Sequence, residues 1–423
     1  MRKSLFKGAF ASFIVVAAIL VSCTDDYEDK TNPPIWTGNT SYAPYAIDWA
    51  EAADSVSQAF IERFYCSEPR NGSDGVFSYT PYNREGGNGN CYWQQAHAMA
   101  AMVDYYNRIK TSDPTEEARI RNYFKRWYDK RGNNYDWDNR GSTGFGNVFT
   151  DDTCWITITL LQIYDATGEQ FYFDAAKKTW DESIWPRHEL NQYGWLPWKL
   201  NDLGANECTN GPGSIIASML SQYAKDAGDE AAAQEYLNQA YTCFDQNLSV
   251  MASNGTLGGT PLSYTQGTCM EAGRLIWKLT GDVAYLRKAI LAARGQMTST
   301  GMNEVYELET VARDEGTDGN NSIFHAVMFH WATRMVLDAE IDKHDAKIRK
   351  ELYTYLLRHA SYYWTRGIDK SEENWPNSYF GVKCYQAFQF GVDDAKDKYG
   401  PMGAYASAAQ VIEGMCMLKD VKF

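Results

Sequence analysis

The sequence predicts an all-α fold, an (α/α)6 barrel in which six helical hairpins close into a toroid. The first observation is a recurring phrase: an apolar helix ends at a glycine, and an acidic residue then opens an amphipathic helix. The phrase occurs at Gly168, Gly228 and Gly281, and glycine accepts the left-handed backbone of a helix C-terminus. The second is a period of roughly 50 to 60 residues, one hairpin per repeat. The third is the count of six hairpins.

Two classes of helix alternate along the chain, and the spacing of apolar residues separates them. The inner helices, which are mostly apolar, are expected near residues 93–109, 152–166, 212–226, 267–279, 322–340 and 403–418. The outer helices, which are amphipathic, are expected near residues 46–65, 115–130, 170–182, 230–247, 283–298 and 344–364. The β-branched segment 156–159 alternates in polarity, so a strand is the alternative there.

An open solenoid of helical hairpins is the rival architecture, and it would suit a binding protein. Closure is favoured by the count of six and by long loops rich in glycine and tryptophan, such as residues 131–150 and 192–212. Loops of this length in a compact domain are usually functional. In a toroid they would meet at one end and form a cleft.

The first residues indicate export. Arg2, Lys3 and Lys7 precede an apolar run over residues 9–21, which is short for a membrane span. The run ends in Leu-Val-Ser before Cys23, an ending that resembles a bacterial lipobox and makes Cys23 the expected lipidated residue. A plain signal peptide with a chance cysteine is the alternative.

Three segments are therefore expected: a signal peptide over residues 1–22, an acidic tether over 23–43 and a catalytic domain over 44–423. The acidic run 24–29 is similar to the export signal of surface lipoproteins in Bacteroides-type bacteria; a solvated linker is the alternative. We expect an outer-membrane lipoprotein at the cell surface, with the periplasmic face as the other orientation. Its only membrane contact would be the lipid, and we expect a monomer.

The composition argues against some classes of function and is compatible with others. The net charge of −14 and the pI near 5.0 argue against a nucleic-acid partner, because phosphate binding needs clustered Lys and Arg. The 14 Trp and 29 Tyr are compatible with rings that stack on sugars and equally with a large aromatic core. Apart from Cys23, the cysteines show no CxxC spacing, so we expect no zinc site. No other metal and no organic cofactor is expected.

Asp151 and Asp152 are adjacent and run straight into an apolar segment that starts at Trp155. Cleavage of a glycosidic bond uses two carboxyl groups: one protonates the leaving oxygen, and the other stabilises or attacks the oxocarbenium-like carbon. Like charges in a partly desolvated cleft would raise the pKa of one of them. The structural alternative is a helix start, where acidic residues serve as caps and interact well with the helix dipole.

Other polar and aromatic residues stand near the expected starts of inner helices, where they could contact a sugar. The substrate-binding candidates are Trp93, Gln94, Gln95, Trp155, Trp198, Asn210, Tyr264, Gln266 and Asp318. Amides can bond to sugar hydroxyls, and aromatic rings can stack on sugar faces. Each candidate has a structural alternative: a core tryptophan, a loop-capping amide or, for Asp318, an Asp-Gly turn.

In combination, these motifs resemble glycoside hydrolase family 76, the α-1,6-mannanases. The resemblance is carried by residues 92–98, 150–155, 210–212, 263–267 and 318–319, and it spans nearly all of the chain after the tether. It implies an (α/α)6 barrel and an endo-acting, retaining hydrolase that cleaves α-1,6-mannosidic bonds in a mannan backbone without a cofactor.

The resemblance makes Asp151 the nucleophile and Asp152 the general acid/base, with the raised pKa. Retaining enzymes hold these carboxyl groups about 5 Å apart, but neighbours in a regular helix point about 100° apart, so we expect the pair at a loop-to-helix junction. Thr150 stands where the family commonly has Tyr, and residues 153–154 replace a bulkier dipeptide, which bears on subsite shape. The alternatives are a toroidal glycosidase for another polysaccharide and a non-catalytic glycan-binding lipoprotein.

Overall fold

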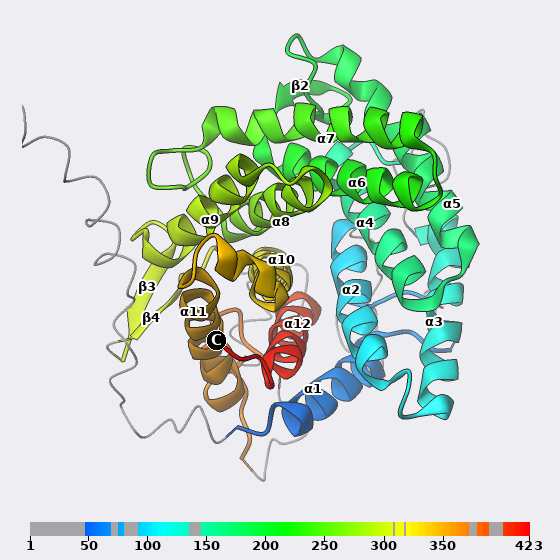
Figure 1. Cartoon of the computed structure of the whole chain (residues 1–423). Coiled ribbons are helices and arrows are strands. Elements are labelled where there is room, and N and C mark those ends of the chain that lie inside the picture. Colours follow the sequence, from blue (N-terminus) through cyan, green and yellow to red (C-terminus); the bar gives the residue numbers. More distant parts are fainter. Residues whose placement is uncertain are drawn as a thin grey trace, which may run out of the picture.

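Alternating apolar and amphipathic segments fold into six helical hairpins in the computed structural model (Figure 1). The structure describes residues 47–68, 75–79, 92–134, 145–307, 309–316, 319–371, 379–388 and 401–423. The inner helices are α2 (Tyr92–Ile109), α4 (Thr150–Thr167), α6 (Glu207–Asp226), α8 (Ser263–Thr280), α10 (Gly319–Leu337) and α12 (Met402–Leu418). The outer helices are α1 (Trp49–Phe64), α3 (Pro114–Asn134), α5 (Gln170–Thr179), α7 (Glu230–Val250), α9 (Val283–Thr298) and α11 (Ile348–Thr365).

The inner helices form a closed ring. Each packs against the next, from α2 through α4, α6, α8 and α10 to α12, and α12 packs against α2 (Figure 1). An open solenoid would leave α2 and α12 apart. The predicted (α/α)6 barrel is therefore confirmed, and the twelve predicted helices match the observed ones with differences of a few residues at their ends.

The helices end at the predicted glycines, and the next helices begin at the predicted acidic residues. Gly168 and Gly281 are left-handed C-caps with φ of 71° and 75°, and Gly228 has φ of 78°. Asp229 and Asp282 then cap α7 and α9, because each side chain accepts a backbone N–H of the new helix. Glycine is needed at these turns because it alone adopts positive φ without a steric cost.

The strand alternative for residues 156–159 is wrong. This segment is the middle of α4, where Thr157 and Thr159 donate their hydroxyls to the carbonyls of Thr153 and Trp155, one turn back. All four side chains are buried. Tertiary packing on every side of an inner helix overrides the strand propensity of β-branched residues.

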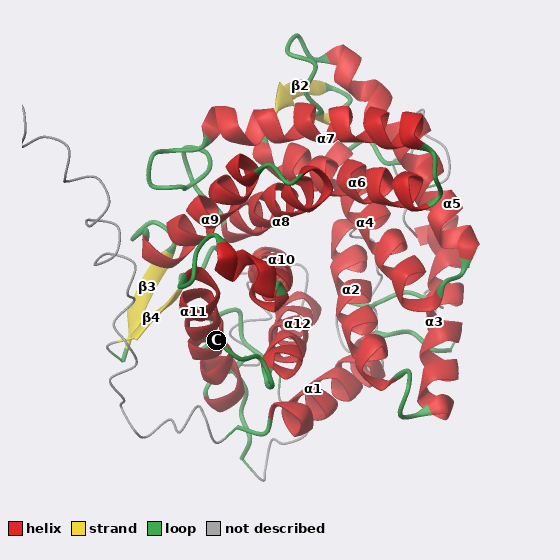
Figure 2. Cartoon of the chain, in the orientation of Figure 1, coloured by secondary structure: helices red, strands yellow, loops and turns green. Residues whose placement is uncertain are grey.

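Two small antiparallel hairpins lie between helices (Figure 2). The first pairs β1 (Pro197–Lys199) with β2 (Asp202–Ala205), and the second pairs β3 (Asn303–Tyr306) with β4 (Glu309–Ala312). A π-helical turn, Trp180–Ile184, and a 3-10 turn, Trp185–Leu190, lead from α5 to the first hairpin. The long loop predicted over residues 192–212 therefore contains an ordered hairpin and the first turns of α6.

Glycines allow the inner helices to approach closely. A Cβ on Gly267 of α8 would lie 2.6 Å from the backbone of Met328 in α10, and one on Gly211 of α6 would lie 2.5 Å from the Thr268 hydroxyl. Real Cβ atoms are not found so close to backbone, so a larger residue at Gly267 would push α8 and α10 apart. This contact explains why residue 267 is a glycine.

A buried carboxylate closes the ring. Glu413 of α12, whose side chain is fully buried, accepts two hydrogen bonds from the guanidinium of Arg108 in α2, at 2.8 and 2.9 Å. The Ser57 hydroxyl of α1 donates to the same carboxylate at 2.6 Å. Bidentate arginine–carboxylate pairs are directional, so this contact sets the register in which the last inner helix meets the first.

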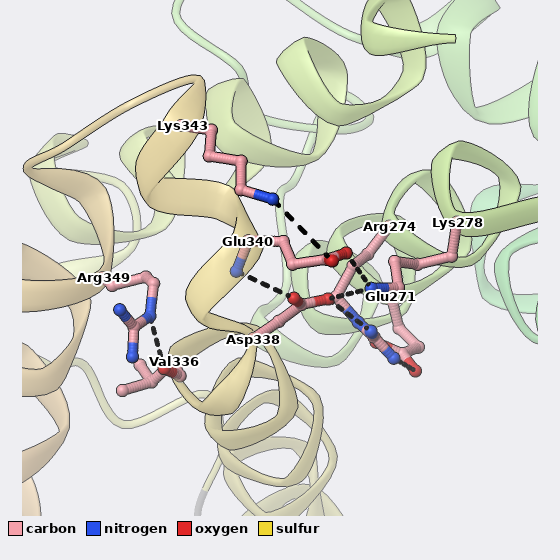
Figure 3. Close-up of polar contacts among 8 residues, drawn as sticks. All are labelled: Glu271, Arg274, Lys278, Val336, Asp338, Glu340, Lys343 and Arg349. Atoms are coloured by element: carbon pink, nitrogen blue, oxygen red, sulfur yellow. Dashed lines mark hydrogen bonds and ion pairs between the residues drawn. The ribbon is translucent and has the colours of Figure 1, made fainter. Parts of the chain in front are cut away.

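A second polar network joins neighbouring hairpins at the C-terminal ends of α8 and α10 (Figure 3). The Arg274 guanidinium bonds to Glu271, at 2.8 Å, and to Asp338, at 3.0 Å, and Lys278 pairs with Glu340. The side chains of Arg274, Glu271 and Asp338 are 14%, 4% and 9% exposed. Glu271 and Arg274 are three residues apart, a spacing that places them on one face of α8.

The seven cysteines that the structure describes are buried and free. Cys23, the signal peptide and the tether lie outside the described residues, so the lipoprotein assignment stays a prediction from the sequence. Within the described ranges, no helix has the length and apolar character needed to span a membrane.

We predict that Arg274→Met destabilises the barrel by about 3–5 kcal/mol, because it leaves the buried carboxylate of Glu271 without its cation and leaves Asp338 with only the more distant Lys278, at 3.6 Å. Denaturant unfolding of the variant measures this loss. Lys343→Ala is the matched control: its side chain is 73% exposed and pairs with Glu340 at 3.9 Å, so its effect should stay below about 1 kcal/mol. Equal effects of the two substitutions would contradict the role given to Arg274.

Candidate active site

The predicted catalytic pair lies in the first turn of α4, and buried hydrogen bonds fix the loop before this helix. The Arg187 guanidinium, which is 5% exposed, donates to the Thr150 hydroxyl at 3.0 Å and to the Asn147 carbonyl at 2.7 Å. The Thr153 hydroxyl donates to the Phe149 carbonyl at 2.8 Å. These bonds therefore hold the turn that presents the two carboxyl groups. The expectation of a loop-to-helix junction is confirmed.

The β1–β2 hairpin packs on the same turn. Phe149 pairs with Lys199 of β1 as an isolated bridge, and the Phe149 and Trp198 rings lie 5.6 Å apart. This pairing brings the indole of Trp198 over α4, where its N–H reaches the carboxyl group of Asp151.

The two carboxyl groups have different surroundings. Asp151 accepts hydrogen bonds from the indole N–H of Trp198 at 3.1 Å, the thiol of Cys208 at 3.7 Å and the backbone N–H of Asp152 at 3.0 Å. Burial raises the pKa of Asp151 to about 6, and these donors limit the rise because they stabilise the ionised form. Burial and the negative charge of Asp151 raise the pKa of Asp152 well above its ordinary value. The surroundings thus favour ionisation of Asp151 over ionisation of Asp152.

The pair opens into a cleft with a volume of about 450 Å³. The residues that line it are Trp93, Phe149, Asp151, Asp152, Trp155, Trp198, Asn206, Cys208, Tyr264 and Phe324. They come from the first two turns of α2, α4, α6, α8 and α10 or from the segments before these helices, so the cleft lies at the N-terminal ends of the inner helices. Aromatic walls around two carboxyl groups fit a neutral sugar ring, whose faces are apolar and whose edge is polar.

Six predicted site residues meet in this cleft: Trp93, Asp151, Asp152, Trp155, Trp198 and Tyr264. The aromatic members are packed against one another or against buried rings. The Tyr264 ring lies 4.3 Å from that of Phe324, and the Trp155 ring lies 4.8 Å from that of His97. Their positions are therefore set by the barrel.

Two predicted sugar-binding amides hold loops instead. Gln95 accepts from the backbone N–H of Phe77 at 2.9 Å and donates to its carbonyl at 2.7 Å. Asn210 makes the same pair of bonds with Leu196, at 3.0 and 2.9 Å. Each side chain replaces the backbone partner that a strand would supply. These contacts favour the structural alternative, an amide that holds a loop, over a sugar ligand for these two residues.

Gln266 acts in the same way: it accepts from the backbone N–H of Leu257 at 2.8 Å and donates to the Gly255 carbonyl at 2.9 Å. It is buried and is not among the residues that line the cleft, which favours the loop-capping alternative here too. Gln94 is fully buried and is not among the residues that line the cleft. Asp318 lies outside the described residues, and its role stays a prediction.

Sequence reasoning missed four residues of the cleft: Phe149, Asn206, Cys208 and Phe324. Phe149 directly precedes the catalytic pair, and Asn206 carries the signal of an N-cap, since its side chain accepts the Thr209 N–H at 3.2 Å. That cap starts α6 at Glu207, five residues before the predicted start. The earlier start is what turns Cys208 toward Asp151.

Buried polar side chains lie beneath the aromatic residues that line the cleft. The pKa of His97 is lowered to about 3 by burial and by His330, so its imidazole is neutral. His330 bonds to Asp104 at 3.1 Å and to Gln162 at 3.0 Å, which agrees with a packing role for this histidine. In the part of the chain that the structure describes, no group of three His, Cys, Asp or Glu residues is arranged to hold a metal ion.

Comparisons with known proteins identify the family and support the fold. The model of glycosyl hydrolase family 76 matches residues 48–420. An inactive variant of the α-1,6-mannanase GH76A of Salegentibacter sp. HEL1_6, with two consecutive aspartates replaced by alanine and α-1,6-mannotetrose bound, is 20% identical with a TM-score of 0.67 and covers 88% of this chain and 100% of its own.

Two other solved structures extend the comparison. The family 76 mannosidase Bt3792 of Bacteroides thetaiotaomicron is 17% identical (TM-score 0.63; 88% of this chain, 99% of its own). Dfg5 of Chaetomium thermophilum, in complex with glucosamine, is 14% identical (TM-score 0.61; 89% and 93%). Among curated proteins, none matches the sequence. Because the family model covers the whole helical domain, this chain belongs to glycosyl hydrolase family 76.

Proposed function

We propose that this glycoside hydrolase cleaves internal α-1,6-mannosidic bonds of a mannan backbone with retention of configuration. The observation that carries the proposal is the adjacent pair Asp151 and Asp152 in an aromatic cleft, with different hydrogen-bond environments. Double displacement requires one ionised and one protonated carboxyl group at the same time. The surroundings of this pair favour that state near neutral pH.

In the first step, the Asp151 carboxylate attacks the anomeric carbon, and the glycosidic C–O bond breaks as Asp152 gives its proton to the leaving oxygen. The product is a mannosyl ester of Asp151. In the second step, Asp152, now ionised, takes a proton from water, and the hydroxide attacks the anomeric carbon and releases Asp151. Two carboxyl groups thus supply the nucleophile, the acid and the base.

Hydrogen bonds from Trp198 and Cys208 make the pKa of Asp151 differ from that of Asp152, which separates the role of nucleophile from that of acid. Both donate to the same oxygen of Asp151, Oδ2. A donor that stabilises the carboxylate lowers its pKa relative to that of its neighbour. The donors therefore favour ionisation of Asp151, and the resulting negative charge helps Asp152 to keep its proton.

The choice of substrate is supported by the neutral aromatic lining of the cleft and by the family. The α-1,6-mannanase of Salegentibacter binds α-1,6-mannotetrose in an inactive variant that lacks two consecutive aspartates. Those substitutions match the kind of pair that this chain carries in α4. Its cleft would hold several mannose units between Trp93, Trp198 and Tyr264, with the scissile bond above the pair.

We expect the protein to release a ladder of manno-oligosaccharides from debranched α-1,6-mannan. Asp152→Asn should lower turnover about 10²–10⁴-fold, because general acid catalysis contributes that much, and Asp151→Asn should abolish the covalent step. Chromatography of the released sugars measures both. Asp202→Asn, an exposed aspartate of β2, is the control and should behave as wild type.

Mannose as the sole product would indicate exo action. Wild-type turnover by Asp152→Asn, or binding without any product, would contradict the proposal and favour the glycan-capture function instead.

The raised pKa values also predict a stability effect. The unfolded-state pKa of an aspartate is about 3.9. A carboxyl group whose folded-state pKa is higher contributes stability that is fully present below the unfolded-state pKa. This stability is lost as the pH rises through the folded-state pKa. Asp152→Asn replaces the carboxyl group with an amide that does not ionise, so the variant does not lose this stability as the pH rises. We expect its melting temperature to exceed that of wild type by about 2–4 °C at pH 8 and to equal it near pH 4. The reverse order at pH 8 would contradict the burial of an acid.

The pH profile of kcat/KM should be bell-shaped. Activity should fall as pH drops below about 6, because Asp151 becomes protonated, and should fall on the alkaline side as Asp152 ionises. Trp198→Phe removes a donor to the carboxylate, so we expect the acidic limb to move up by about one unit, given the strength of a hydrogen bond to a charged group. An acidic limb that stays in place in Trp198→Phe would show that the indole does not tune Asp151.

A further inference from the structure

A second hollow lies beside the β1–β2 hairpin, outside the catalytic cleft, and has a volume of about 410 Å³. The residues that line it are Leu190, Asn191, Gln192, Tyr193, Trp195, Leu203, Gly204 and Ala205. None of these eight is charged. The side chains of Leu190, Tyr193 and Leu203 are 47%, 64% and 45% exposed, and they are three of the six most exposed large hydrophobic residues in the described part of the chain. Exposed apolar residues that gather in one place mark an interaction site.

The hollow has an aromatic surface. The rings of Tyr193 and Trp195 lie 4.8 Å apart with an angle of 33° between their planes, so together they present a broad apolar surface. Gln192 adds an amide to its lining, whereas the Asn191 amide is bonded within the loop. An apolar face with neutral hydrogen-bonding groups at its rim matches a neutral sugar, which has an apolar face and a rim of hydroxyls.

The loop that carries these rings is held in place. The Asn191 side chain donates to the Leu203 carbonyl at 2.7 Å and accepts the Tyr193 N–H at 2.9 Å. Gly194 has φ of 72°, which lets the chain turn between the two aromatic residues. Asn210 fixes the next residue through its two bonds to Leu196. Ordered aromatic residues lose little entropy when they bind a ligand.

The hairpin connects this hollow to the cleft. Trp195 lines the hollow, and Trp198, three residues later, lines the cleft; likewise Ala205 lines the hollow and Asn206 lines the cleft. In Figure 2 the β2 strand lies at the outer edge of the ring. The same short hairpin is thus one wall of both sites, and a polysaccharide that leaves the cleft over this wall reaches the second hollow.

We propose that the hollow around Tyr193 and Trp195 is a second glycan-binding site, which holds a neutral polysaccharide chain while another part of that chain occupies the catalytic cleft. The identity of this polysaccharide as α-1,6-mannan rests on the proposed function. The site binds several sugar units by stacking, and it raises the affinity for polymer without taking part in bond cleavage. Two linked sites gain affinity because the second binding event is intramolecular.

The test compares Tyr193→Ala with wild type, as full chains, on α-1,6-mannan polymer and on α-1,6-mannotetraose. Loss of one stacked ring should raise KM for the polymer about threefold to tenfold, with kcat unchanged and with both constants unchanged for the tetrasaccharide. Tyr193→Phe keeps the ring and should keep the polymer KM near wild type. Val305→Ala removes another exposed apolar side chain, 72% exposed in β3, and should change nothing.

A polymer KM that stays at the wild-type value in Tyr193→Ala would overturn the proposal, and so would an equal rise for polymer and tetrasaccharide. Electrophoresis in gels that contain the polysaccharide distinguishes failure of the second-site proposal from failure of the mannanase proposal. If the wild-type protein is retarded by mannan without cleaving it, the mannanase assignment fails, and the loss of retardation in Tyr193→Ala still supports the second site. Retardation equal to wild type in that variant would refute the glycan site.

Discussion

Two adjacent carboxyl groups, partly buried in the first turn of α4, are the constraint on which the rest of the site depends. The positive end of the helix dipole favours their ionised forms, but the loss of water raises both pKa values, so desolvation outweighs the dipole. A pair of this kind is unstable by itself, and the surrounding fold has to hold it. Arg187 fixes the turn before the pair, Trp198 and Cys208 solvate one carboxylate, and the remaining structure offsets the burial of the other.

The groups that destabilise the fold lie at one end of the barrel, and ion pairs that stabilise it lie at the other. At the N-terminal ends of the inner helices, aromatic side chains and two carboxyl groups line a cleft. At the C-terminal ends of α8 and α10, ion pairs around Arg274 join neighbouring hairpins (Figure 3). Glu413 closes the ring between α12, α2 and α1. Strain at a functional site is commonly balanced by stability elsewhere in the fold.

Most of the fold could be predicted from the sequence, because helical spacing and glycine caps are local signals: the phrase at Gly168, Gly228 and Gly281 marks three of the turns. The site was harder. The Asp151–Asp152 pair and three aromatic residues of the cleft, Trp93, Trp155 and Tyr264, follow from their places near helix starts, and Trp198 follows from its place in a long loop. Gln95, Asn210 and Gln266 stand at the same kind of position, yet they face loops. Whether an amide at a helix start points into the cleft depends on the rotation of that helix and on the loop beside it, and neither is encoded locally. Cys208 was missed for a related reason, since the Asn206 cap starts α6 early.

The central claim is a double displacement in which Asp151 forms a covalent intermediate. Proton NMR of the first products of α-1,6-mannotetraose hydrolysis tests it most directly, because the anomer that forms first reports the stereochemistry before mutarotation. We predict that the new reducing end appears first as the α-anomer, the retained configuration. A β-anomer that appears first would show single displacement by water and would contradict the role of Asp151 as the nucleophile.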